Sequence, residues 1–344
     1  MTFTGLAFDE LAALLGSRTR AAAARRWLYR GGAVPSELPA LIPGVSAAAW
    51  DKVRAAAPLP CFRLAGREQA ADGTIKYAID LAGAVVEAVL IPARGRSTVC
   101  VSSQAGCSRA CKFCATATLG LVRSLDAGEI LLQYAIAAAD APPGSPVRNV
   151  VFMGMGEPMD NLDAVMRAID LLCERPWPGL SPAHVTVSTS GVLPGMKRFL
   201  REGSGHLALS LNATTDTQRQ RMIPHNRTWP IAALLGALRE DQAVHPGRRA
   251  FIEYVLWEGV NDTAEDALRL AALLDGLDAQ VNVIPHNGFA ASAFRAPADD
   301  AVRAFPAALT AMGVHGIVRW PRGRDIAAAC GQLAGRRPSL SAEA

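Results

Sequence analysis

The feature that most constrains the fold of this chain is the alternation of strand-like and helix-like segments between residues 98 and 320. Short runs rich in β-branched and apolar residues are followed, in most cases, by a longer stretch with helical periodicity. Strands are expected at 98–102, 149–153, 184–188, 206–211, 250–256, 280–284 and 316–320. Helices are expected at 126–139, 162–174, 231–241, 264–274 and 299–312, the first opened by an Asp-x-x-Glu capping box at Asp126 and Glu129.

Repeated β-α units with right-handed crossovers build a parallel sheet, so the sequence predicts an α/β fold. We expect this sheet to curve into a partial (β/α)6-type barrel over residues 97–335. Residues 1–60 have the pattern of short helices and would form a small N-terminal domain. Residues 61–96 have β texture around an Asp72-Gly73 turn, typical of a β-hairpin linker, and residues 336–344 would be a C-terminal tail.

Composition narrows the class of protein. With 50% hydrophobic residues among 344, the chain can bury a large core, yet no apolar run reaches the ~20 residues that cross a bilayer. No basic segment followed by an apolar one occurs at the N-terminus, so a cytoplasmic protein without membrane attachment is expected. Seven cysteines, three of them clustered, fit a reducing compartment better than a disulfide framework.

The segment from residue 18 to residue 30 combines arginines with two aromatic residues. Arginine pairs with phosphates and aromatic rings stack on bases, so this helix is a candidate RNA-contacting face of the N-terminal domain. The alternative is a solvated helix face with two core aromatics, and the sequence favours neither. The residues concerned are Arg18, Arg20, Arg25, Arg26 and Arg30, with Trp27 and Tyr29 between them.

Unusual polar residues come just after the expected strands, at 154–158, 189–191, 212–214 and 285–287. Because the carboxyl ends of the strands form one rim of a β/α barrel, these clusters predict a common ligand site. Gly154 and Gly156 would let the backbone approach a ligand closely, and Glu157 would take its ammonium group or a ribose hydroxyl. A plain turn is the alternative for the two glycines.

A C-x3-C-x2-C triplet, Cys107, Cys111 and Cys114, follows the first strand of the barrel. Closed four-iron sites use four thiolates, so three thiolates leave one iron open to another ligand. The occupant expected there is S-adenosylmethionine (SAM), whose amino and carboxylate groups can chelate iron. Structural zinc is the alternative, but it needs a fourth ligand close by, and the first downstream histidine is His184.

Two further cysteines would face the same mouth. Cys100 lies on the first strand, and Cys330 precedes a glycine in an arginine-flanked loop after the last strand. That setting favours a reactive thiolate at Cys330.

With these motifs, the chain resembles the radical SAM RNA methyltransferases of the RlmN/Cfr type over residues 25–335. The resemblance rests on segments 86–92, 100–104 with the triplet, 154–158, 188–191 and 329–333. It implies a radical SAM barrel in which Cys330 carries a methyl group, Cys100 resolves a covalent adduct and Glu87 accepts a proton. It also implies a SAM site formed by Gly156, Glu157, Ser188, Ser210, Leu211, Asn212 and Asn287.

The resemblance implies methylation of an adenine ring carbon, C2 of an adenine in 23S rRNA, with tRNA as a second candidate substrate. One SAM molecule would methylate Cys330, and a second, cleaved by an electron from a [4Fe-4S] cluster, would give the radical that activates that methyl group. The family uses an electron donor such as flavodoxin or ferredoxin, and a monomer is expected.

The sequence departs from the family pattern at Asn212, Gly288, Trp320 and Ala327. None of these changes removes a cluster ligand or a thiol, so they leave activity in place but the choice of substrate open. The enzyme alternative is C8 methylation of adenine in 23S rRNA. The alternative of another class is a catalytically silent iron–sulfur RNA-binding protein, which would have no use for both Cys100 and Cys330.

Overall fold

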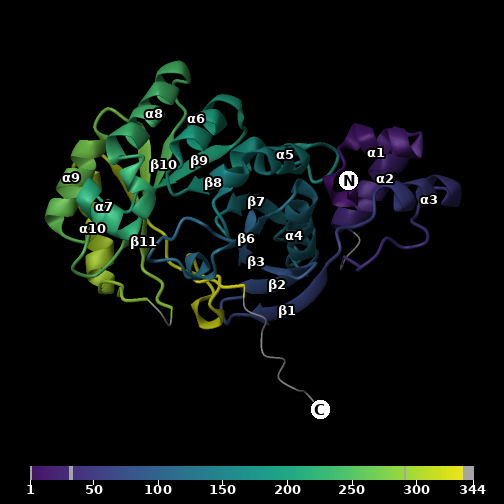
Figure 1. Ribbon diagram of the computed structural model, residues 1–344, viewed down its shortest axis with the longest axis horizontal. Coiled ribbons are helices and arrows are strands. Elements are labelled where there is room, and N and C mark those ends of the chain that lie inside the picture. Colours follow the sequence, from purple (N-terminus) through teal and green to yellow (C-terminus); the bar gives the residue numbers. More distant parts are fainter. Residues whose placement is uncertain (1, 31–33, 290–291, 336–344) are drawn as a thin grey trace, which may run out of the picture.

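The computed structural model describes residues 2–30, 34–289 and 292–335 of the chain (Figure 1). A ten-stranded sheet with the order β1-β2-β3-β4-β7-β8-β9-β10-β11-β12 dominates this part of the chain. From β4 to β12 neighbouring strands are parallel, which confirms the expected α/β barrel-type architecture. The expected tail at 336–344 lies outside the described residues.

The strands of the barrel agree with the sequence expectation to within two or three residues at each end. They are β4 (Arg96–Cys100), β7 (Val147–Phe152), β8 (Val185–Thr189), β9 (His206–Ser210), β10 (Ala250–Leu256), β11 (Ala279–Pro285) and the short β12 (His315–Val318). A separate two-stranded sheet pairs β5 (Gln104–Gly106) with β6 (Leu121–Ser124) and encloses the segment that carries the cysteine triplet.

Helices flank the outer side of the curved sheet (Figure 1). They are α4 (Ala127–Ala139), α5 (Leu162–Cys173), α6 (Leu193–Glu202), α7 (Asp216–Met222), α8 (Ile231–Val244), α9 (Ala264–Leu274) and α10 (Asp299–Ala311). The capping box at Asp126 and Glu129 is confirmed, since each side chain accepts a hydrogen bond from the other's backbone N–H. Helices α6 and α7 were not expected from the sequence.

The segment expected as a hairpin linker has three strands and continues the main sheet. β1 (Arg63–Gln69), β2 (Ile75–Leu81) and β3 (Ala84–Ala93) are antiparallel, and β3 pairs with β4 through Val89 opposite Cys100. Buried apolar side chains under these strands belong to the same hydrophobic cluster as the barrel core. This segment therefore lies directly beside the first strand of the barrel and places Glu87 of β3 next to it.

The N-terminal helices α1 (Phe8–Leu15), α2 (Arg18–Arg30) and α3 (Ala47–Ala56) enclose a small core of their own. Trp27 belongs to that core, with its ring centroid 6.2 Å from Trp50, and Tyr29 packs on Tyr134 of α4. Arg25 is buried and donates to Glu174 at 2.6 Å and to the Leu6 carbonyl at 2.8 Å. The alternative of two core aromatics is therefore correct for Trp27 and Tyr29, whereas Arg25 is neither solvated nor open to RNA.

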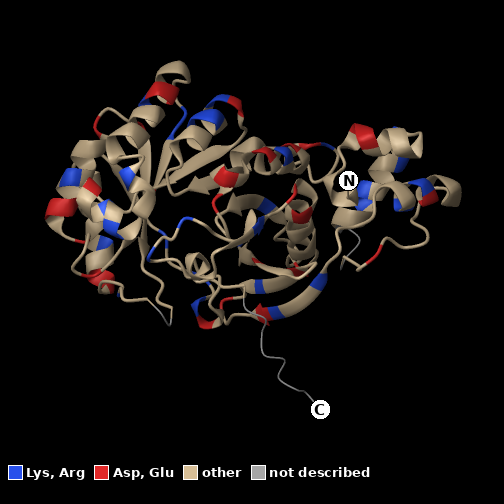
Figure 2. Ribbon diagram, in the orientation of Figure 1, with Lys and Arg blue, Asp and Glu red and all other residues tan. Residues whose placement is uncertain are grey.

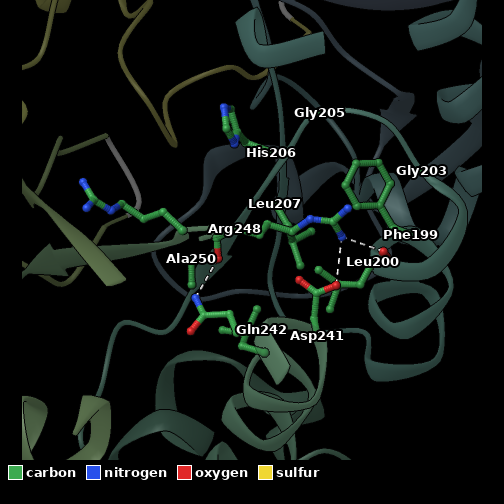
Figure 3. Close-up of a pocket in the computed structure, with 12 residues that line it drawn as sticks. Phe199, Leu200, Gly203, Gly205, His206, Leu207, Asp241, Gln242, Arg248 and Ala250 are labelled. Atoms are coloured by element: carbon green, nitrogen blue, oxygen red, sulfur yellow. Dashed lines mark hydrogen bonds and ion pairs between the residues drawn. The ribbon is translucent and has the colours of Figure 1, made fainter. Parts of the chain in front are cut away.

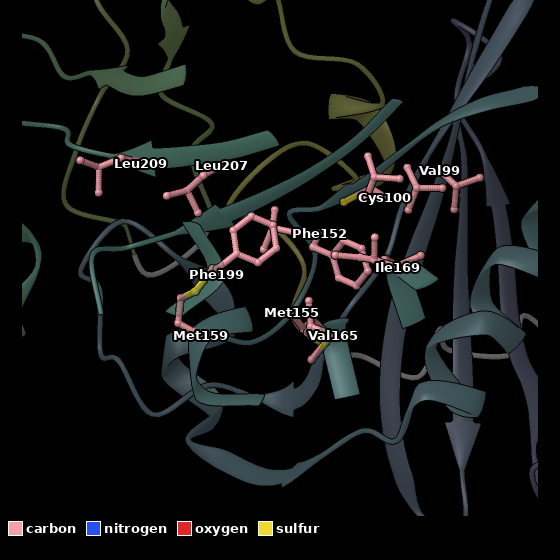
Figure 4. Packing of buried hydrophobic residues seen from close by; sticks show 14 of the residues in the cluster. Val99, Cys100, Phe152, Met155, Met159, Val165, Ile169, Phe199, Leu207 and Leu209 are labelled. Carbon is pink, nitrogen blue, oxygen red and sulfur yellow. The ribbon is translucent and has the colours of Figure 1, made fainter. Parts of the chain in front are cut away.

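A small pocket lies at the amino ends of β9 and β10, next to Phe199 and His206 (Figure 3). Arg248 donates there to the Leu200 carbonyl and to Asp241, both at 2.8 Å. Towards the middle of the sheet, Phe152, Met155, Val165 and Ile169 pack around the strands near Cys100 (Figure 4).

None of the described helices is long and apolar enough to span a bilayer.

Candidate active site

The carboxyl ends of the parallel strands surround an open cavity of about 1060 Å³. Its lining includes ten of the residues that the sequence singled out: Cys107, Cys111, Cys114, Gly156, Glu157, Ser188, Ser210, Asn212, Asn287 and Cys330. Three others do not line it. Leu211 and Cys100 are buried in the core, and Glu87 is buried in β3.

The cysteine triplet lies on a loop between β5 and β6 that is folded against the rest of the mouth. The Lys112 N–H donates to the Met222 carbonyl at 3.0 Å, and Phe113 packs on the buried Trp257 with a centroid separation of 5.2 Å. The Arg109 N–H approaches the Cys107 sulfur at 3.5 Å, a contact that suits a thiolate bound to a metal. The loop therefore presents three thiols to the cavity beside an apolar wall.

The arrangement of the three thiols fits an iron–sulfur cluster. All three are free thiols, and the described residues contain no group of three His, Cys, Asp or Glu side chains that could hold one metal ion. A zinc site needs all its ligands around one ion, whereas in a four-iron cluster each thiolate binds a different iron. Burial, followed by the neighbouring Cys114 and then Cys107 thiolates, holds the pKa of Cys111 well above its usual range, and a cationic cluster would offset both effects.

Glu157 is a buried carboxylate in the wall of the same cavity as the triplet. It is 3% exposed, and its Oε2 accepts from the Ser190 N–H at 2.8 Å and the Ser190 hydroxyl at 2.6 Å, while Oε1 accepts from the Met159 N–H at 3.1 Å. Burial raises the pKa of Glu157, and the hydrogen bonds from Ser190 oppose that shift. The side chain is thus held rigidly, facing a cavity that can take a cationic group.

The two glycines before Glu157 serve packing as well as the cavity. A Cβ at Gly154 would lie 2.7 Å from the Ser102 hydroxyl, and one at Gly156 would lie 2.6 Å from Cβ of Gln104. Gly156 also has a φ of +99°, which L side chains rarely adopt. Close packing is therefore a second reason for both glycines, beside the expected approach to a ligand. Their absent side chains admit the neighbouring backbone of residues 101–104, although both glycines line the cavity as well.

The remaining predicted SAM contacts sit at the ends of neighbouring strands. The hydroxyls of Ser188 on β8 and Ser210 on β9 lie 3.4 Å apart. Asn212, with a φ of +60°, accepts from the Val255 N–H through Oδ1 at 2.9 Å, so that side-chain oxygen already has a partner. Asn287 after β11 donates to the Cys330 carbonyl at 3.2 Å, which links the SAM-site rim to the loop of Cys330.

The loop that carries Cys330 is fixed on three sides of the mouth. The Gly331 carbonyl accepts from the Ala115 N–H at 2.7 Å, next to the triplet, and Gln332 donates to the Gly288 carbonyl at 2.7 Å. On the third side, Oε2 of Glu87 accepts from the N–H groups of Ala334 and Gly335 at 2.7 and 3.1 Å. The closest cation to Glu87 is Lys76, whose Nζ lies 3.7 Å away.

The electrostatic environment of Cys330 differs from the expectation. Its side chain faces the open cavity, but protein surrounds the sulfur on the other sides. This partial enclosure is the first cause, and the Glu253 carboxylate the second, that raises the thiol pKa to about 11. The flanking Arg324 donates to Asn287 instead of activating the sulfur. The expectation of a ready thiolate is therefore wrong for the protein without ligand, and Cys330 needs a proton acceptor.

Cys100 lies at the end of β4 and does not line the cavity. Its side chain is buried, and burial first and the Cys330 thiolate second raise its pKa. The two thiols are therefore coupled electrostatically.

Sequence reasoning missed two charged residues of the mouth. Glu253 of β10 lines the cavity, and Arg219 of α7 is fully buried beneath it, whereas His286 lines the cavity within the polar cluster 285–287 that the sequence predicted. Arg219 donates to the carbonyls of Leu211, Ser190 and Ser210 at 2.9, 2.6 and 3.0 Å, which joins the ends of β8 and β9. The available signal was a single glutamate inside the apolar run of β10, where a charged residue is costly unless it is used.

The chain is similar to known methyltransferases along most of its length. The family model described as Radical SAM superfamily matches residues 101–271. A protein named as a probable RNA methyltransferase of Sorangium cellulosum is 48% identical over 85% of this chain and 74% of its own length. A dual-specificity RNA methyltransferase RlmN of Anaeromyxobacter dehalogenans is 45% identical over 94% of this chain and 88% of its own length.

A solved structure agrees with the fold. The crystal structure of a radical SAM methyltransferase from Sphaerobacter thermophilus superimposes with a TM-score of 0.91 at 38% sequence identity, over 98% of this chain and all of that one.

The cluster assignment leads to a first prediction. Anaerobically purified protein should be brown and contain about four iron atoms and an equal amount of sulfide per chain. Replacement of Cys107, Cys111 or Cys114 by alanine should abolish the cluster, since each thiolate would hold its own iron, whereas Cys173→Ala, outside the mouth, should keep it. Iron and sulfide analysis measures both, and stoichiometric zinc without sulfide would contradict the assignment.

Proposed function

Because the chain belongs to the RlmN-type family of radical SAM RNA methyltransferases, we propose that it methylates C2 of adenine in RNA, with 23S rRNA and tRNA as substrates. The observation that carries this proposal is the arrangement of the mouth. One cavity holds three cluster-type thiols, a carboxylate suited to a cationic ligand and a further thiol, Cys330, to which the buried thiol of Cys100 is coupled electrostatically.

In this proposal Cys107, Cys111 and Cys114 hold a [4Fe-4S] cluster, and SAM binds in the cavity beside it. The cluster, when bound, supplies the electron that cleaves SAM to a radical. Glu157 faces the ammonium group of SAM, and Gly156, Ser188, Ser210, Asn212 and Asn287 surround the rest of the molecule. Leu211 contributes through its backbone, because its side chain is buried in the core.

The two thiols divide the work. Cys330, which the cavity exposes, takes the methyl group from SAM and later carries it to the adenine ring as a covalent link. Cys100, buried beside it, attacks that link to release the methylated base, which leaves a Cys100–Cys330 disulfide to be reduced. Two SAM molecules are consumed per turnover, one to methylate Cys330 and one as the source of the radical.

Glu87 is proposed to accept the proton that leaves the adenine carbon. It is 2% exposed, and burial raises its pKa against the pull of Lys76, which makes it a stronger base than an exposed carboxylate. Its hydrogen bonds to Ala334 and Gly335 join it to the Cys330 loop. In the described structure Glu87 lies behind that loop, so the loop has to shift when RNA binds for the carboxylate to reach the base.

Nothing in the described site favours C8 over C2, and a catalytically silent iron–sulfur protein would have no use for both the Cys330 thiol of the cavity and the buried Cys100 thiol coupled to it.

Nucleoside mass spectrometry tests the proposed reaction. Deletion of the gene should remove 2-methyladenosine from 23S rRNA and tRNA, and the wild-type chain should restore it, while the Cys107→Ala variant should not. Restoration of 8-methyladenosine instead would show that the ring position is wrong, and an unchanged nucleoside profile would contradict RNA methylation.

We also propose that the N-terminal helices contact RNA, but through fewer residues of α2 than the sequence suggested. Arg18 and Arg26 of α2 are exposed, whereas Arg25, Trp27 and Tyr29 pack inside the protein, and the side chain of Arg30 lies outside the described residues. Figure 2 shows both signs of charge on these helices, so the face is mixed and not uniformly basic.

A charge reversal tests this contact better than removal of residues 1–60, because deletion would uncover the face of α4 on which this segment packs. Arg26→Glu should weaken RNA binding and lower the slope of log affinity against log salt by about 1. The control is Arg201→Glu on α6, another exposed arginine on the outside of the barrel. Equal binding and salt dependence of the two variants would show that α2 is only solvated.

The proposal also covers the oligomeric state, the cellular location and the electron donor of the enzyme. We infer that it acts as a monomer in the cytoplasm and takes electrons from a small donor such as flavodoxin or ferredoxin. Elution at the mass of one 36.2 kDa chain and bleaching of the cluster's visible absorption by reduced flavodoxin would support these points.

A further inference from the structure

Glu253 has no role in the reaction as described so far, although it lies inside the active-site cavity. It is 7% exposed, sits near the middle of β10 and points to the same cavity as Cys330 and Ser210. A buried carboxylate costs several kcal/mol unless it is paired or used, so its presence in an apolar strand needs an explanation.

The hydrogen bonds around Glu253 hold one of its oxygens and leave the other open. Oε1 accepts from Nδ2 of Asn282 at 2.7 Å. The amide of Asn282 is itself fixed, because its Oδ1 accepts from Gln280 at 3.0 Å and from Arg319 at 3.2 Å. Among the described residues no donor lies within hydrogen-bonding distance of Oε2, and that oxygen is not enclosed by protein. The second oxygen is therefore available on the cavity side.

The other acidic or basic groups near the mouth are already engaged. Glu157 accepts from Ser190 and Met159 through both oxygens, and Asp160 is paired with Arg109. His286 lines the cavity, but burial lowers its pKa to about 4, and its Nε2 is 2.8 Å from the Ser292 hydroxyl. Glu87 lies behind the Cys330 loop and does not line the cavity.

Charges support a link between Glu253 and Cys330. Burial raises the pKa of Glu253 to about 7, against the hydrogen bond from Asn282 and the charge of Arg319. The Glu253 carboxylate is in turn the second cause, after burial, of the raised pKa of Cys330. Asn282 on β11 and Arg319 after β12 lower the pKa of Glu253, and Cys330 is the thiol whose pKa the Glu253 carboxylate raises. The partner of Glu253 on β9 is Ser210, and Glu157, His286 and the three triplet thiols are the other titratable groups that line the same cavity.

We propose that Glu253 is the proton acceptor for the Cys330 thiol in the first methyl transfer, an inference that rests on the proposed function. The S–H proton passes to the Glu253 carboxylate as the sulfur attacks the methyl carbon of SAM. The new S–C bond forms while the bond from that carbon to the sulfonium breaks, and its electron pair stays on the departing S-adenosylhomocysteine. Glu253 then releases the proton to water. Its role is separate from that of Glu87, which acts on the adenine proton.

This step can be measured apart from radical chemistry. Anaerobic, cluster-reconstituted protein whose mass shows no methyl group is mixed with SAM carrying a trideuterated methyl, without reductant, and the Cys330 peptide is followed by mass spectrometry. Glu253→Gln should load the methyl about 100-fold more slowly or worse, as expected for loss of a general base. In the wild type the loading rate should rise as pH passes through about 7, where the carboxyl ionises, and the variant should lose this rise.

A second measurement needs no SAM. Alkylation of Cys330 by iodoacetamide reports the apparent pKa of its thiol, and Glu253→Gln should shift this pKa to lower pH because a neighbouring negative charge is removed. A carboxylate that exerts no electrostatic influence on Cys330 would leave the pKa unchanged. The matched control is Glu240→Gln, the same chemical change at an exposed carboxylate of α8, which should resemble the wild type in both experiments.

The outcomes distinguish failure of the proposed function from failure of the inference about Glu253. If wild-type protein itself acquires no label on Cys330, the proposed function fails. If the wild type loads and Glu253→Gln, with unchanged SAM affinity, loads at the same rate with the same pH dependence, Glu253 is not the proton acceptor. An unshifted Cys330 pKa in the variant would overturn the inference as well.

Discussion

The active site depends on one constraint, the three-sided attachment of the Cys330 loop over the barrel mouth. The loop receives hydrogen bonds from Ala115 beside the cysteine triplet and from Asn287 after β11, and it donates to Glu87 of β3. Ala115 and Glu87 lie more than 200 residues before the loop in the sequence, and Asn287 lies 43 residues before Cys330. A thiol that must meet both a SAM methyl and an RNA base has to be held close to the cluster loop, and these backbone hydrogen bonds do so without using the thiol itself.

Ionising the carboxylates and thiols of the mouth also costs electrostatic free energy. The mouth brings the carboxylates Glu157 and Glu253 together with at least four thiols in a poorly solvated space, which raises the pKa of most of these groups. Arg219, fully buried, is the main opposing charge from below and ties the ends of β8 and β9 through their carbonyls. Ligands that bring positive charge, an iron centre and a sulfonium, would therefore bind to a site already short of cations.

Much of this arrangement follows from the sequence, and the exceptions have physical reasons. Strand positions, the capping box of α4 and the shared rim were predictable because periodicity and cap chemistry are local signals. Helix α7 was not, since its seven residues are held by the buried contacts of Arg219 and not by their own propensity. The partners of Arg25, Trp27 and Tyr29 were equally out of reach, because a basic aromatic helix has the same sequence whether it faces RNA or α4. Glu253 stood in the sequence as a lone acid in an apolar strand, but only the structure places it beside Cys330.

The central claim is that Cys330 carries the methyl group and Cys100 resolves the adduct, and a denaturing gel tests it most directly. Each variant would be incubated with RNA, SAM and a reductant. Cys100→Ala should accumulate a covalent protein–RNA species, because addition to the ring still occurs but nothing breaks the bond. Cys330→Ala should form none, and the double variant should behave like Cys330→Ala, as expected of residues that act in sequence. Turnover by Cys330→Ala at the wild-type rate would contradict the account.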